Sequence, residues 1–490
     1  MPTKLLIANR GEIAVRVARA ARERGAEVVA VFTEADRHSL HLRFADEAVA
    51  LGDDPRAYLD IERIVQAARR SGADAIHPGY GFLSENADFA EACQRARIAF
   101  VGPPPAAIRA MGSKERARAA MTAAGVPVVP GGPASTLEEA RETARRVGYP
   151  ILVKATDGGG GKGMRRVDRE AELAQVLERT ASEALSAFGS RAVYIEKAID
   201  HPRHVEIQVL GDRDGRLVHL FERDCSIQRR HQKIIEETPC PALPSATLDE
   251  MCRVALRAAE AIGYYSAGTC EFLLDSNGAF YFLEMNTRLQ VEHPITELVT
   301  GVDLVHEMLR IADGERLSID VPRRRGAAIE ARINAEDPKR GFLPSPGKIE
   351  QWIAPAGPGV RVDSGVAAGS EVSPHYDPLL AKLSVWGETR AAAVARLRRA
   401  LGEFAVVGVD TNLGFLLDLA HDPAFERGVY ATDFVTLHPQ LGARQLPETT
   451  RQDLGRALGA LALLDEKVEH RVATGASPWV LADRARLRDR

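Results

Sequence analysis

The sequence predicts a multidomain protein that combines the α/β and α+β classes, and three observations carry this prediction. The chain has 490 residues, more than one hydrophobic core usually serves, so we expect several domains. Over the first hundred residues, short apolar strands alternate with helices rich in Ala and Arg, the pattern of a doubly wound parallel sheet. Residues 341–404 are rich in Gly, Pro and short strands and end in a helix, which predicts a mixed α+β domain.

Composition and charge narrow the functional classes. The formal net charge is −4, so no global positive field indicates nucleic-acid binding. The cysteines show no zinc spacing, and a scattered, odd-numbered set is typical of a reducing compartment; they are Cys93, Cys225, Cys240, Cys252 and Cys270. No apolar run approaches the ~20 residues of a membrane span, and the apolar start is too short for a signal peptide. We therefore expect a cytoplasmic protein that binds neither nucleic acid nor membrane.

The first domain is predicted element by element. The expected strands are 4–9, 27–32, 48–51, 73–77 and 99–102, and the expected helices are 11–24, one after Tyr58 and one from Asn86. The first turn has a single glycine and lacks the G-x-G-x-x-G fingerprint, so no NAD site is inferred. The loop 77–82 (HPGYGF) could offer backbone amides to a ligand, although a tight turn is the simpler explanation. A rigid break at 102–105 (GPPP) ends this domain.

A glycine-rich segment at 157–164 (DGGGGKGM) separates two expected strands, 150–155 and 164–167. It is not a Walker A loop, because no Ser or Thr follows Lys162 and a strand rather than a helix comes next. The backbone amides of such a hairpin could fold over phosphates while Lys154 and Lys162 offset their charge. A flexible linker is the alternative.

The middle of the chain carries strands that contain polar residues. Strand 193–198 includes the pair Glu196-Lys197, and strand 204–210 alternates Glu206 and Gln208 with apolar residues. The run 222–233 (ERDCSIQRRHQK) suits anion binding better than a solvated face, because it contains four cations: Arg223, Arg229, Arg230 and Lys233. Further expected elements are helices at 113–124, 248–262 and 389–401, a strand at 328–335 that contains Arg332, and a tail beyond 447 that is first helical and then polar.

The segment 283–297 (LEMNTRLQVEHPITE) is the strongest candidate for a functional site. Polar residues occupy its even positions, and most odd positions between them are apolar; the polar set is Glu284, Asn286, Arg288, Gln290 and Glu292. Alternate side chains of an extended chain share a face. One ribbon would therefore present two carboxylates, two amides and a guanidinium to one side.

The strands 269–275 and 279–285 flank Asn277-Gly278, a dipeptide that favours a two-residue hairpin turn. With that turn, Glu271 lies directly opposite Glu284. Opposed like charges destabilise a sheet, and a divalent cation such as Mg²⁺ would compensate them. A pair screened by water is the alternative, and a turn one residue longer or shorter would remove the pairing.

Six motifs occur in order along the chain: ANRGEIA (8–14), HPGYGFLSEN (77–86), GGGGKGM (158–164), RHVEIQV (203–209), ERDCSIQRRHQKIIEE (222–237) and EMNTRLQVEHPITE (284–297). Together they resemble the biotin carboxylase component of biotin-dependent carboxylases, within the ATP-grasp superfamily. The resemblance runs from about Lys4 to Leu437, and details at 33–41 and 100–112 are similar to the acyl-CoA carboxylase branch. It implies a Rossmann-like N-terminal domain (1–112), an ATP-grasp lid domain with the glycine-rich loop (113–203), an ATP-grasp core (204–325), a mixed C-terminal domain (326–445) and a helical, polar tail (446–490).

The resemblance also implies roles for individual residues. For ATP binding it implies Lys114, Lys154, Gly158, Gly159, Gly160, Gly161, Gly163, Glu196, Lys197, Ile199, His204, Gln228 and His231. For the metal it implies Glu271, Glu284 and Asn286. For bicarbonate and biotin it implies Lys233, Arg288, Gln290, Val291, Glu292, Arg332, Tyr80 and Gly81, among which Lys233, Arg288, Glu292 and Arg332 are the expected catalytic residues.

The implied reaction is the carboxylation of biotin at N1′ through carboxyphosphate, with ATP, Mg²⁺ or Mn²⁺ and bicarbonate, on biotin bound to a carrier. The implied partners are a biotin carboxyl carrier protein or domain, a carboxyltransferase subunit and a second copy of the chain in a homodimer. The sequence has seven methionines and none precedes a lysine, so we expect a carrier supplied in trans. The tail segment 475–479 (GASPW) resembles the opening of the docking segment of fused acyl-CoA carboxylase subunits.

Two alternatives remain. One is another ATP-grasp ligase, such as a carbamoyl-phosphate or purine-pathway enzyme, which would form an acylphosphate without biotin. The other is a non-catalytic scaffold subunit, which would lack at least one site residue.

Overall fold

The computed structural model describes residues 3–155, 164–188, 191–319 and 321–442. The predicted lid loop and the tail beyond Gly442 lie outside these residues. None of the helices in the described ranges is long and apolar enough to cross a bilayer.

A parallel sheet opens the chain, in the order β3 (Glu47–Gly52), β2 (Glu27–Thr33), β1 (Lys4–Ile7), β4 (Ala75–His77), β5 (Ala99–Phe100). Leu5 and Ile7 of β1 pack with α1 (Gly11–Glu23) and α10 (Leu304–Ala312). Leu6 packs on the opposite side with α2 (Ile61–Ser71) and α3 (Ala87–Arg95). Helices therefore cover both faces, and the predicted doubly wound sheet is confirmed.

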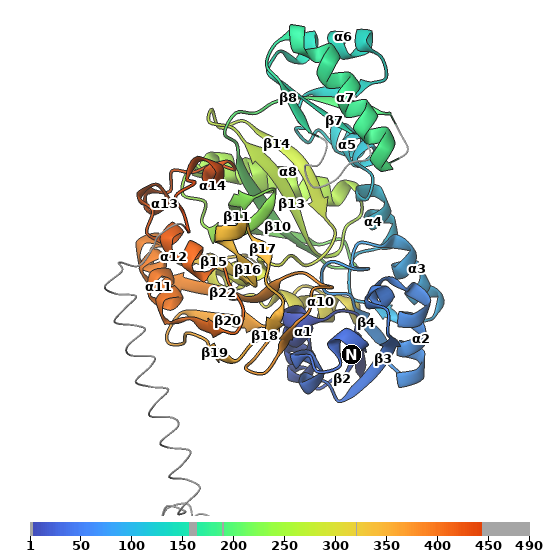
Figure 1. The fold of residues 1–490 in the computed structure, drawn as a ribbon. Coiled ribbons are helices and arrows are strands. Elements are labelled where there is room, and N and C mark those ends of the chain that lie inside the picture. The colour runs from blue at the N-terminus through green and yellow to red at the C-terminus, as the bar shows by residue number, and fades with distance from the viewer. Residues whose placement is uncertain (1–2, 156–163, 189–190, 320, 443–490) are drawn as a thin grey trace, which may run out of the picture. The chain divides into compact units, whose positions relative to one another are not determined.

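A smaller antiparallel sheet follows, in the order β6 (Gly131–Ala134), β9 (Val193–Lys197), β7 (Ile151–Ala155), β8 (Arg165–Val167). Two helices bury its apolar face, α6 (Leu137–Val147) and α7 (Glu170–Phe188) (Figure 1). The strands on either side of the glycine-rich segment, β7 and β8, are neighbours in this sheet, as the sequence predicted.

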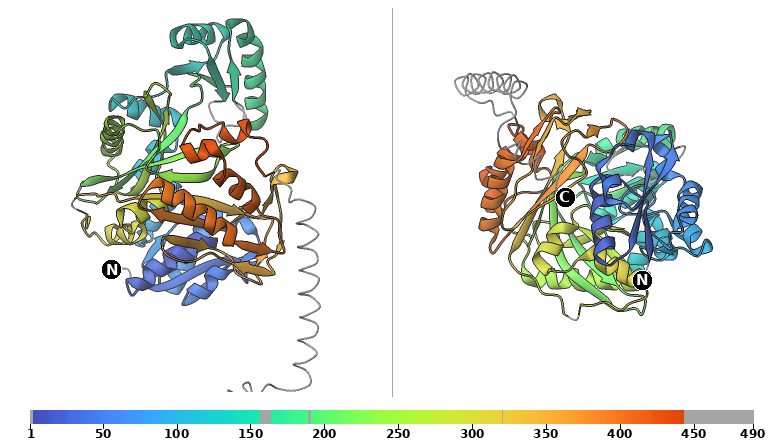
Figure 2. Two further views of the ribbon diagram at one scale, coloured as in Figure 1. Left: turned by 90° about the vertical axis from the view of Figure 1, so that its left-hand side faces the viewer. Right: turned by 90° about the horizontal axis from the view of Figure 1, so that it is seen from below.

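The largest sheet is antiparallel throughout, in the order β14 (Phe280–Asn286), β13 (Ser266–Leu274), β10 (Arg203–Gly211), β11 (Leu217–Arg229), β12 (Gln232–Thr238), β15 (Ala327–Asn334), β22 (Leu379–Gly387), β20 (Val360–Ser364). Helix α8 (Ser245–Ala261) packs against its first strands. Helices α11 (Arg390–Glu403) and α12 (Leu413–Ala420) pack against β15 and β22 (Figure 2). One continuous sheet thus joins the middle of the chain to its C-terminal part.

The remaining elements are short. The helices are α4 (Pro105–Met111), α5 (Lys114–Ala123), α9 (His293–Thr300), α13 (Pro423–Arg427) and α14 (Phe434–Leu437). The 3₁₀ turns are η1 (Glu34–Asp36), η2 (Leu40–Phe44), η3 (Pro55–Leu59) and η4 (Pro338–Arg340). Three strand pairs complete the fold: β16 (Glu336–Asp337) with β17 (Leu343–Pro344), β18 (Gly347–Lys348) with β21 (Glu371–Val372), and β19 (Gln351–Ile353) with β23 (Ala405–Val407).

The turn between β13 and β14 is one residue longer than predicted. The Asp275 amide donates to the Ala279 carbonyl at 2.8 Å, which closes a three-residue loop rather than a two-residue turn. The Asp275 carboxylate also accepts hydrogen bonds from the amides of Asn277 and Ala279. Gly278 adopts φ +85°, a conformation that glycine takes without strain. The Asn-Gly dipeptide alone predicts a two-residue turn. The side chain of Asp275, which that prediction does not consider, stabilises the longer loop.

The longer loop does not break the predicted pairing of Glu271 with Glu284, because a bulge restores the register. Next to the loop, Phe272 lies opposite Phe282, one residue away from the predicted register. A bulge then inserts the exposed Leu283, and Glu271 lies opposite Glu284. The pairing prediction is confirmed, whereas the turn from which it was argued is wrong.

The predicted ribbon at 284–292 is extended only in its first part. Strand β14 ends at Asn286, and residues 287–290 are irregular. Glu292 directly precedes α9, so its backbone already turns into the helix (φ −81°, ψ 11°). Strict alternation therefore does not explain how these side chains are placed.

Candidate active site

Polar side chains gather on one face of the large sheet, where β10 to β15 meet the segment 287–292. Arg223 of β11 is completely buried at the base of this cluster. Its guanidinium donates to Glu206 at 2.5 Å, Gln208 at 2.7 Å and Gln290 at 2.8 Å. It also donates to Thr296 of α9, so this one side chain connects the sheet to the helix and to the irregular segment.

Lys233 of β12 brings three carboxylates together. Its Nζ atom lies 2.5 Å from Glu206, 2.9 Å from Glu271 and 2.6 Å from Glu292. Burial disfavours the ammonium form, but the surrounding negative charges raise the pKa of Lys233 well above its ordinary value. Lys233 is therefore a permanent cation at the centre of the cluster.

Glu292 is held between two cations. One of its oxygens meets Lys233, and the other accepts a hydrogen bond from the Arg332 guanidinium at 2.8 Å. Burial favours the neutral acid, but Lys233 and Arg332 together hold the pKa of Glu292 well below its ordinary value. Arg332 also donates to Glu236 at 2.6 Å, and burial raises the pKa of Glu236 to about 7.

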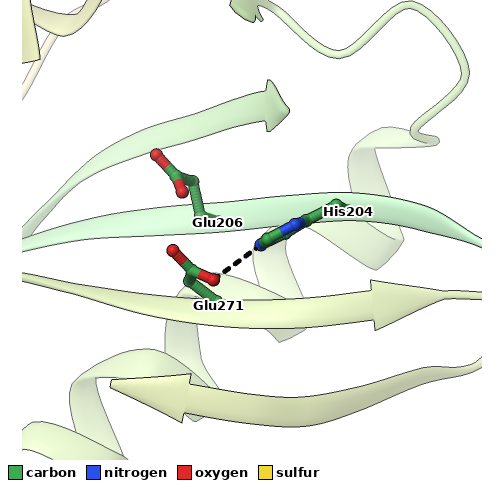
Figure 3. A group of neighbouring side chains, drawn as sticks. All are labelled: His204, Glu206 and Glu271. Atoms are coloured by element: carbon green, nitrogen blue, oxygen red, sulfur yellow. Dashed lines mark ion pairs between the residues drawn. The ribbon is translucent and has the colours of Figure 1, made fainter. Parts of the chain in front are cut away.

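Figure 3 shows His204, Glu206 and Glu271 together between β10 and β13. The Nε2 atom of His204 lies 2.8 Å from a Glu271 oxygen. Burial disfavours the imidazolium, but Glu271 raises the pKa of His204. Burial likewise disfavours the Glu271 anion, yet Lys233 and His204 hold the pKa of Glu271 well below its ordinary value. The Gln228 amide lies 2.8 Å from the other ring nitrogen of His204 and fixes the orientation of the ring.

Polar side chains at the end of β14 and in the irregular segment 287–290 contact the cluster. Asn286 and Gln290 both donate to one oxygen of Glu271, at 2.8 and 2.7 Å. Arg288 donates to Asn286 at 2.8 Å and to Glu85 at 2.8 Å. The even-numbered residues of the motif therefore meet through tertiary contacts rather than through a single extended ribbon.

The donor set around Glu271 fits a hard divalent cation. Glu271 is ionised and Glu284 is an exposed carboxylate opposite it in the hairpin, whereas Asn286 turns its amide nitrogen to Glu271 and its oxygen to Arg288. Magnesium prefers oxygen ligands of this kind. Desolvation and the Glu271 carboxylate raise the pKa of Glu284, against the opposing effect of His204 and Lys233.

The candidate nucleotide residues of the small sheet lie on adjacent strands. Lys154 of β7 forms an ion pair with Glu196 of β9. Lys197 instead donates to the carbonyls of Gly148 and Tyr149, at 3.1 and 2.9 Å. Ile199 is partly buried just after β9. Lys114 begins α5, His231 is exposed in the turn between β11 and β12, and the predicted loop glycines lie outside the described residues.

The loop after β4 is held in place by the N-terminal domain. The Asn9 amide donates to the carbonyls of Pro78 and Tyr80, at 2.7 and 2.8 Å. A side chain at Gly79 would collide with Asn9, since an added Cβ would lie 2.7 Å from its amide nitrogen. The Tyr80 hydroxyl donates to Glu12 of α1, and Gly81 is exposed with φ +68°.

Several residues of the cluster are not among the predicted site residues. The sequence places Glu206 in an alternating strand and Arg223 in a cationic run that suits anion binding, whereas the structure brings them to Lys233 and Gln290. Glu236 and Glu85, which hold Arg332 and Arg288, were also missed. A charged residue inside an otherwise apolar strand was the available signal, since such residues are rarely buried unless paired.

Three family models match the chain: "Biotin carboxylase, N-terminal domain" over residues 1–108, "Carbamoyl-phosphate synthase L chain, ATP binding domain" over 113–320 and "Biotin carboxylase C-terminal domain" over 330–436. Among curated proteins, a biotin carboxylase of Nostoc is 52% identical over 438 residues, which is 88% of this chain and 98% of that protein. The methylcrotonoyl-CoA carboxylase subunit alpha of Dictyostelium discoideum is 47% identical over 97% of this chain and 69% of that protein.

Among solved structures, the biotin carboxylase domain dimer of Hydrogenobacter thermophilus 2-oxoglutarate carboxylase, in complex with MgADP, ADP and bicarbonate, matches with a TM-score of 0.87. The two sequences are 47% identical, and the match covers 91% of this chain and all of that one. All three domains are thus present in this chain, and they span nearly the full length of the Nostoc protein and of the Hydrogenobacter domain but about two thirds of the Dictyostelium subunit. The chain belongs to the biotin carboxylase family.

Proposed function

We propose that this chain uses ATP and bicarbonate to carboxylate biotin at N1′ on a biotin carboxyl carrier. The observation that carries the proposal is the position of Glu292, ionised between Lys233 and Arg332. This arrangement provides a base beside two fixed cations. It suits a reaction in which bicarbonate loses a proton and the γ-phosphate of ATP, itself an anion, is attacked.

The first step would use Glu292 as the base. Glu292 takes the proton of bicarbonate, and the resulting oxyanion attacks the γ-phosphorus of ATP, so that ADP leaves and carboxyphosphate forms. A carboxylate with a lowered pKa is a weak base in the empty site, but further anions bound beside it raise its proton affinity. Lys233 and Arg288 would offset the charge that develops on the transferred phosphoryl group.

Magnesium, when bound by Glu271, Glu284 and Asn286, supplies further neutralisation of phosphate charge. Lys114, Lys154, Glu196, Ile199, His204, Gln228 and His231 are the candidates that would bind the nucleotide, together with Lys197 and the glycines of 158–163. Cations from both the small and the large sheet would thus offset the negative charge of the ATP phosphates.

The second step would take place at Arg332. Carboxyphosphate breaks into CO₂ and phosphate, phosphate accepts the N1′ proton of biotin, and N1′ attacks CO₂. Arg332 would stabilise the negative charge on the ureido oxygen, and Tyr80 and Gly81 would border the biotin ring. Glu236, which holds the Arg332 guanidinium at 2.6 Å, fixes the direction in which it points.

The proposed partners are a biotin carboxyl carrier, a carboxyltransferase subunit and a second copy of this chain. Two relatives support them: the Dictyostelium protein is a subunit of an acyl-CoA carboxylase, and the Hydrogenobacter domain is described as a dimer. The tail that resembles a docking segment agrees with assembly into a larger carboxylase.

The test is ATP cleavage measured with and without bicarbonate and with and without free biotin. We expect cleavage that requires bicarbonate, is accelerated by biotin and yields one carboxybiotin for each ADP at saturating biotin. ATP cleavage that does not depend on biotin, and that yields carbamoyl phosphate when ammonia is added, would identify another ligase. The absence of cleavage in folded, nucleotide-binding protein would favour a scaffold.

A further inference from the structure

We propose that Lys382 is a positioning residue for this reaction, a role that rests on the function proposed above. It fixes the main chain beside Glu292 and, through Glu12, the Tyr80 loop. Lys382 thereby joins the expected bicarbonate site to the expected biotin site. It lies in β22, far along the chain from every motif that the sequence analysis assigned to the site.

Lys382 is a completely buried lysine with specific partners. Its Nζ atom donates to the Val291 carbonyl at 2.8 Å and lies 3.1 Å from a Glu12 oxygen. The same Glu12 oxygen accepts the hydrogen bond of the Tyr80 hydroxyl. The ammonium also lies 5.9 Å from the centre of the Tyr80 ring. One cation therefore contacts α1, the loop after β4 and the residue before Glu292.

The sheet register explains why Lys382 and Arg332 contact neighbouring residues, Val291 and Glu292. Arg332 of β15 lies directly opposite Lys382 of β22. Side chains that face each other on adjacent strands lie on the same side of a sheet. Arg332 donates to the Glu292 carboxylate, and Lys382 donates to the carbonyl of the preceding residue. The two strands thus hold both the side chain and the backbone at Val291–Glu292.

A purely structural role does not account well for this ammonium. Burying a charge costs several kcal/mol, and buried ion pairs can often be replaced by apolar residues without loss of stability. Asp363, the other carboxylate nearby, lies 4.0 Å from Lys382 and is already held by Arg361. The close partners of Lys382 are a backbone carbonyl of the proposed bicarbonate site and the carboxylate that holds Tyr80.

The main test is the double variant Glu12→Gln with Lys382→Met, which removes both charges at nearly constant volume. Burial raises the pKa of Glu12, so its carboxyl group readily accepts a proton. In the variant, the neutral amide of glutamine takes the place of this carboxyl group. We expect kcat for bicarbonate-dependent ATP cleavage to fall by about 10–100-fold, because small displacements of reacting groups cost this much. KM for bicarbonate should rise about tenfold, while the Kd for ATP and the stoichiometry of ATP binding stay unchanged.

The KM readout separates positioning from damage to the fold. A smaller folded fraction would lower kcat and the ATP stoichiometry together and leave KM for bicarbonate unchanged, and that result would overturn the proposal. Wild-type kinetics in the double variant would overturn it as well. A wild-type protein without bicarbonate-dependent cleavage would instead refute the proposed function itself.

The control is Glu237→Gln with Arg390→Met, which removes another ion pair (2.6 Å), between the buried Glu237 and the partly exposed Arg390. Glu237 follows Glu236 in β12 and therefore lies on the opposite face of the sheet. We expect its KM for bicarbonate to equal that of the wild type. The single variant Glu12→Gln keeps the test decisive if the double variant does not fold. It leaves Lys382 on the Val291 carbonyl, so KM for bicarbonate should stay constant while more ATP is cleaved for each carboxybiotin; unchanged coupling would refute the link to Tyr80.

Discussion

Glu292 shows how a single carboxylate can be kept ionised in a buried site. Two cations approach its two oxygens, at 2.6 and 2.8 Å, and outweigh the cost of burial. We predict that Glu292→Gln keeps ATP binding but lowers turnover by roughly 10²–10⁴, the usual contribution of a general base. Steady-state kinetics and ATP titration check this. The control Glu307→Gln removes a buried carboxylate of α10 and should turn over normally; near-normal activity of Glu292→Gln would refute the assignment.

Glu271 and Glu284 differ in what else they hold, and this difference sharpens the metal prediction. Glu271 contacts Lys233 and His204, whereas Glu284 is exposed opposite it. We predict that both Gln variants need more Mg²⁺ for half-maximal ATP cleavage, and that added Mg²⁺ rescues Glu284→Gln more completely, because only the metal contact is lost there. Magnesium titrations measure this, and unchanged Mg²⁺ dependence in both variants would make the pair merely structural.

Glu236 supplies a stability prediction with a definite sign. Its pKa is about 7 in the folded protein and 4.5 ordinarily, so between these values the folded state binds more protons than the unfolded state. Its contribution to the unfolding free energy is therefore complete below about pH 4.5 and is lost as the pH rises through 7. The wild-type stability relative to Glu236→Gln should fall by up to about 3 kcal/mol over this window. Urea unfolding at several pH values tests this, and a constant difference would contradict it.

The sequence motifs indicate Lys233 and Glu292 as candidate site residues, and the resemblance to a known family adds Arg332. Their ionisation states were not predictable, because these depend on partners from distant strands. The pKa of Glu236 rises because burial outweighs the opposing effect of Arg332, which lies nearly a hundred residues away in the chain. Lys382 is likewise a charged residue inside an apolar strand, but the local sequence does not indicate that its partners are Val291 and Glu12.

At the scale of elements, the hairpin β13–β14 has the predicted pairing of Glu271 with Glu284, but its loop differs from the predicted turn. Periodicity correctly predicted both strands, but the Asp275 side chain selected a longer loop and the bulge at Leu283 compensated for it. Hydrophobic alternation reports which face is buried, and it carries no information about a residue that leaves the ladder. The same limit applies to residues 287–290, where alternation predicts an extended ribbon and the backbone is irregular.

Two glycines give a matched pair of predictions about elements. Gly278 has φ +85° in open space, so Gly278→Ala should destabilise the protein by about 1 kcal/mol through backbone strain alone. Gly402 lies in α11, also in open space, and Gly402→Ala should stabilise the protein by about 0.5–1 kcal/mol. Thermal unfolding of both variants measures the two effects. Shifts of the same sign would refute the conformational argument.

At the scale of the whole molecule, the site forms where three parts of the chain meet. Glu85 reaches Arg288 from the N-terminal domain, and Lys382 reaches Val291 from the C-terminal strands. The class of each part was predictable because its pattern is local. Their meeting point was not, because it depends on contacts between residues about ninety to two hundred positions apart.

The last prediction concerns the carrier. Biotin carriers that resemble this family present a lysine between methionines, and none of the seven methionines here precedes a lysine. We therefore expect the purified chain to be silent on a streptavidin blot, to carboxylate free biotin slowly and to carboxylate a separate biotinylated carrier much faster. Docking would raise the effective concentration of biotin at Tyr80 and Arg332, an advantage that free biotin lacks. Comparing kcat/KM for free and carrier-bound biotin measures this, with the unbiotinylated carrier as the control. A streptavidin band at the mass of this chain that survives denaturation, or equal kcat/KM for the two forms, would contradict the prediction.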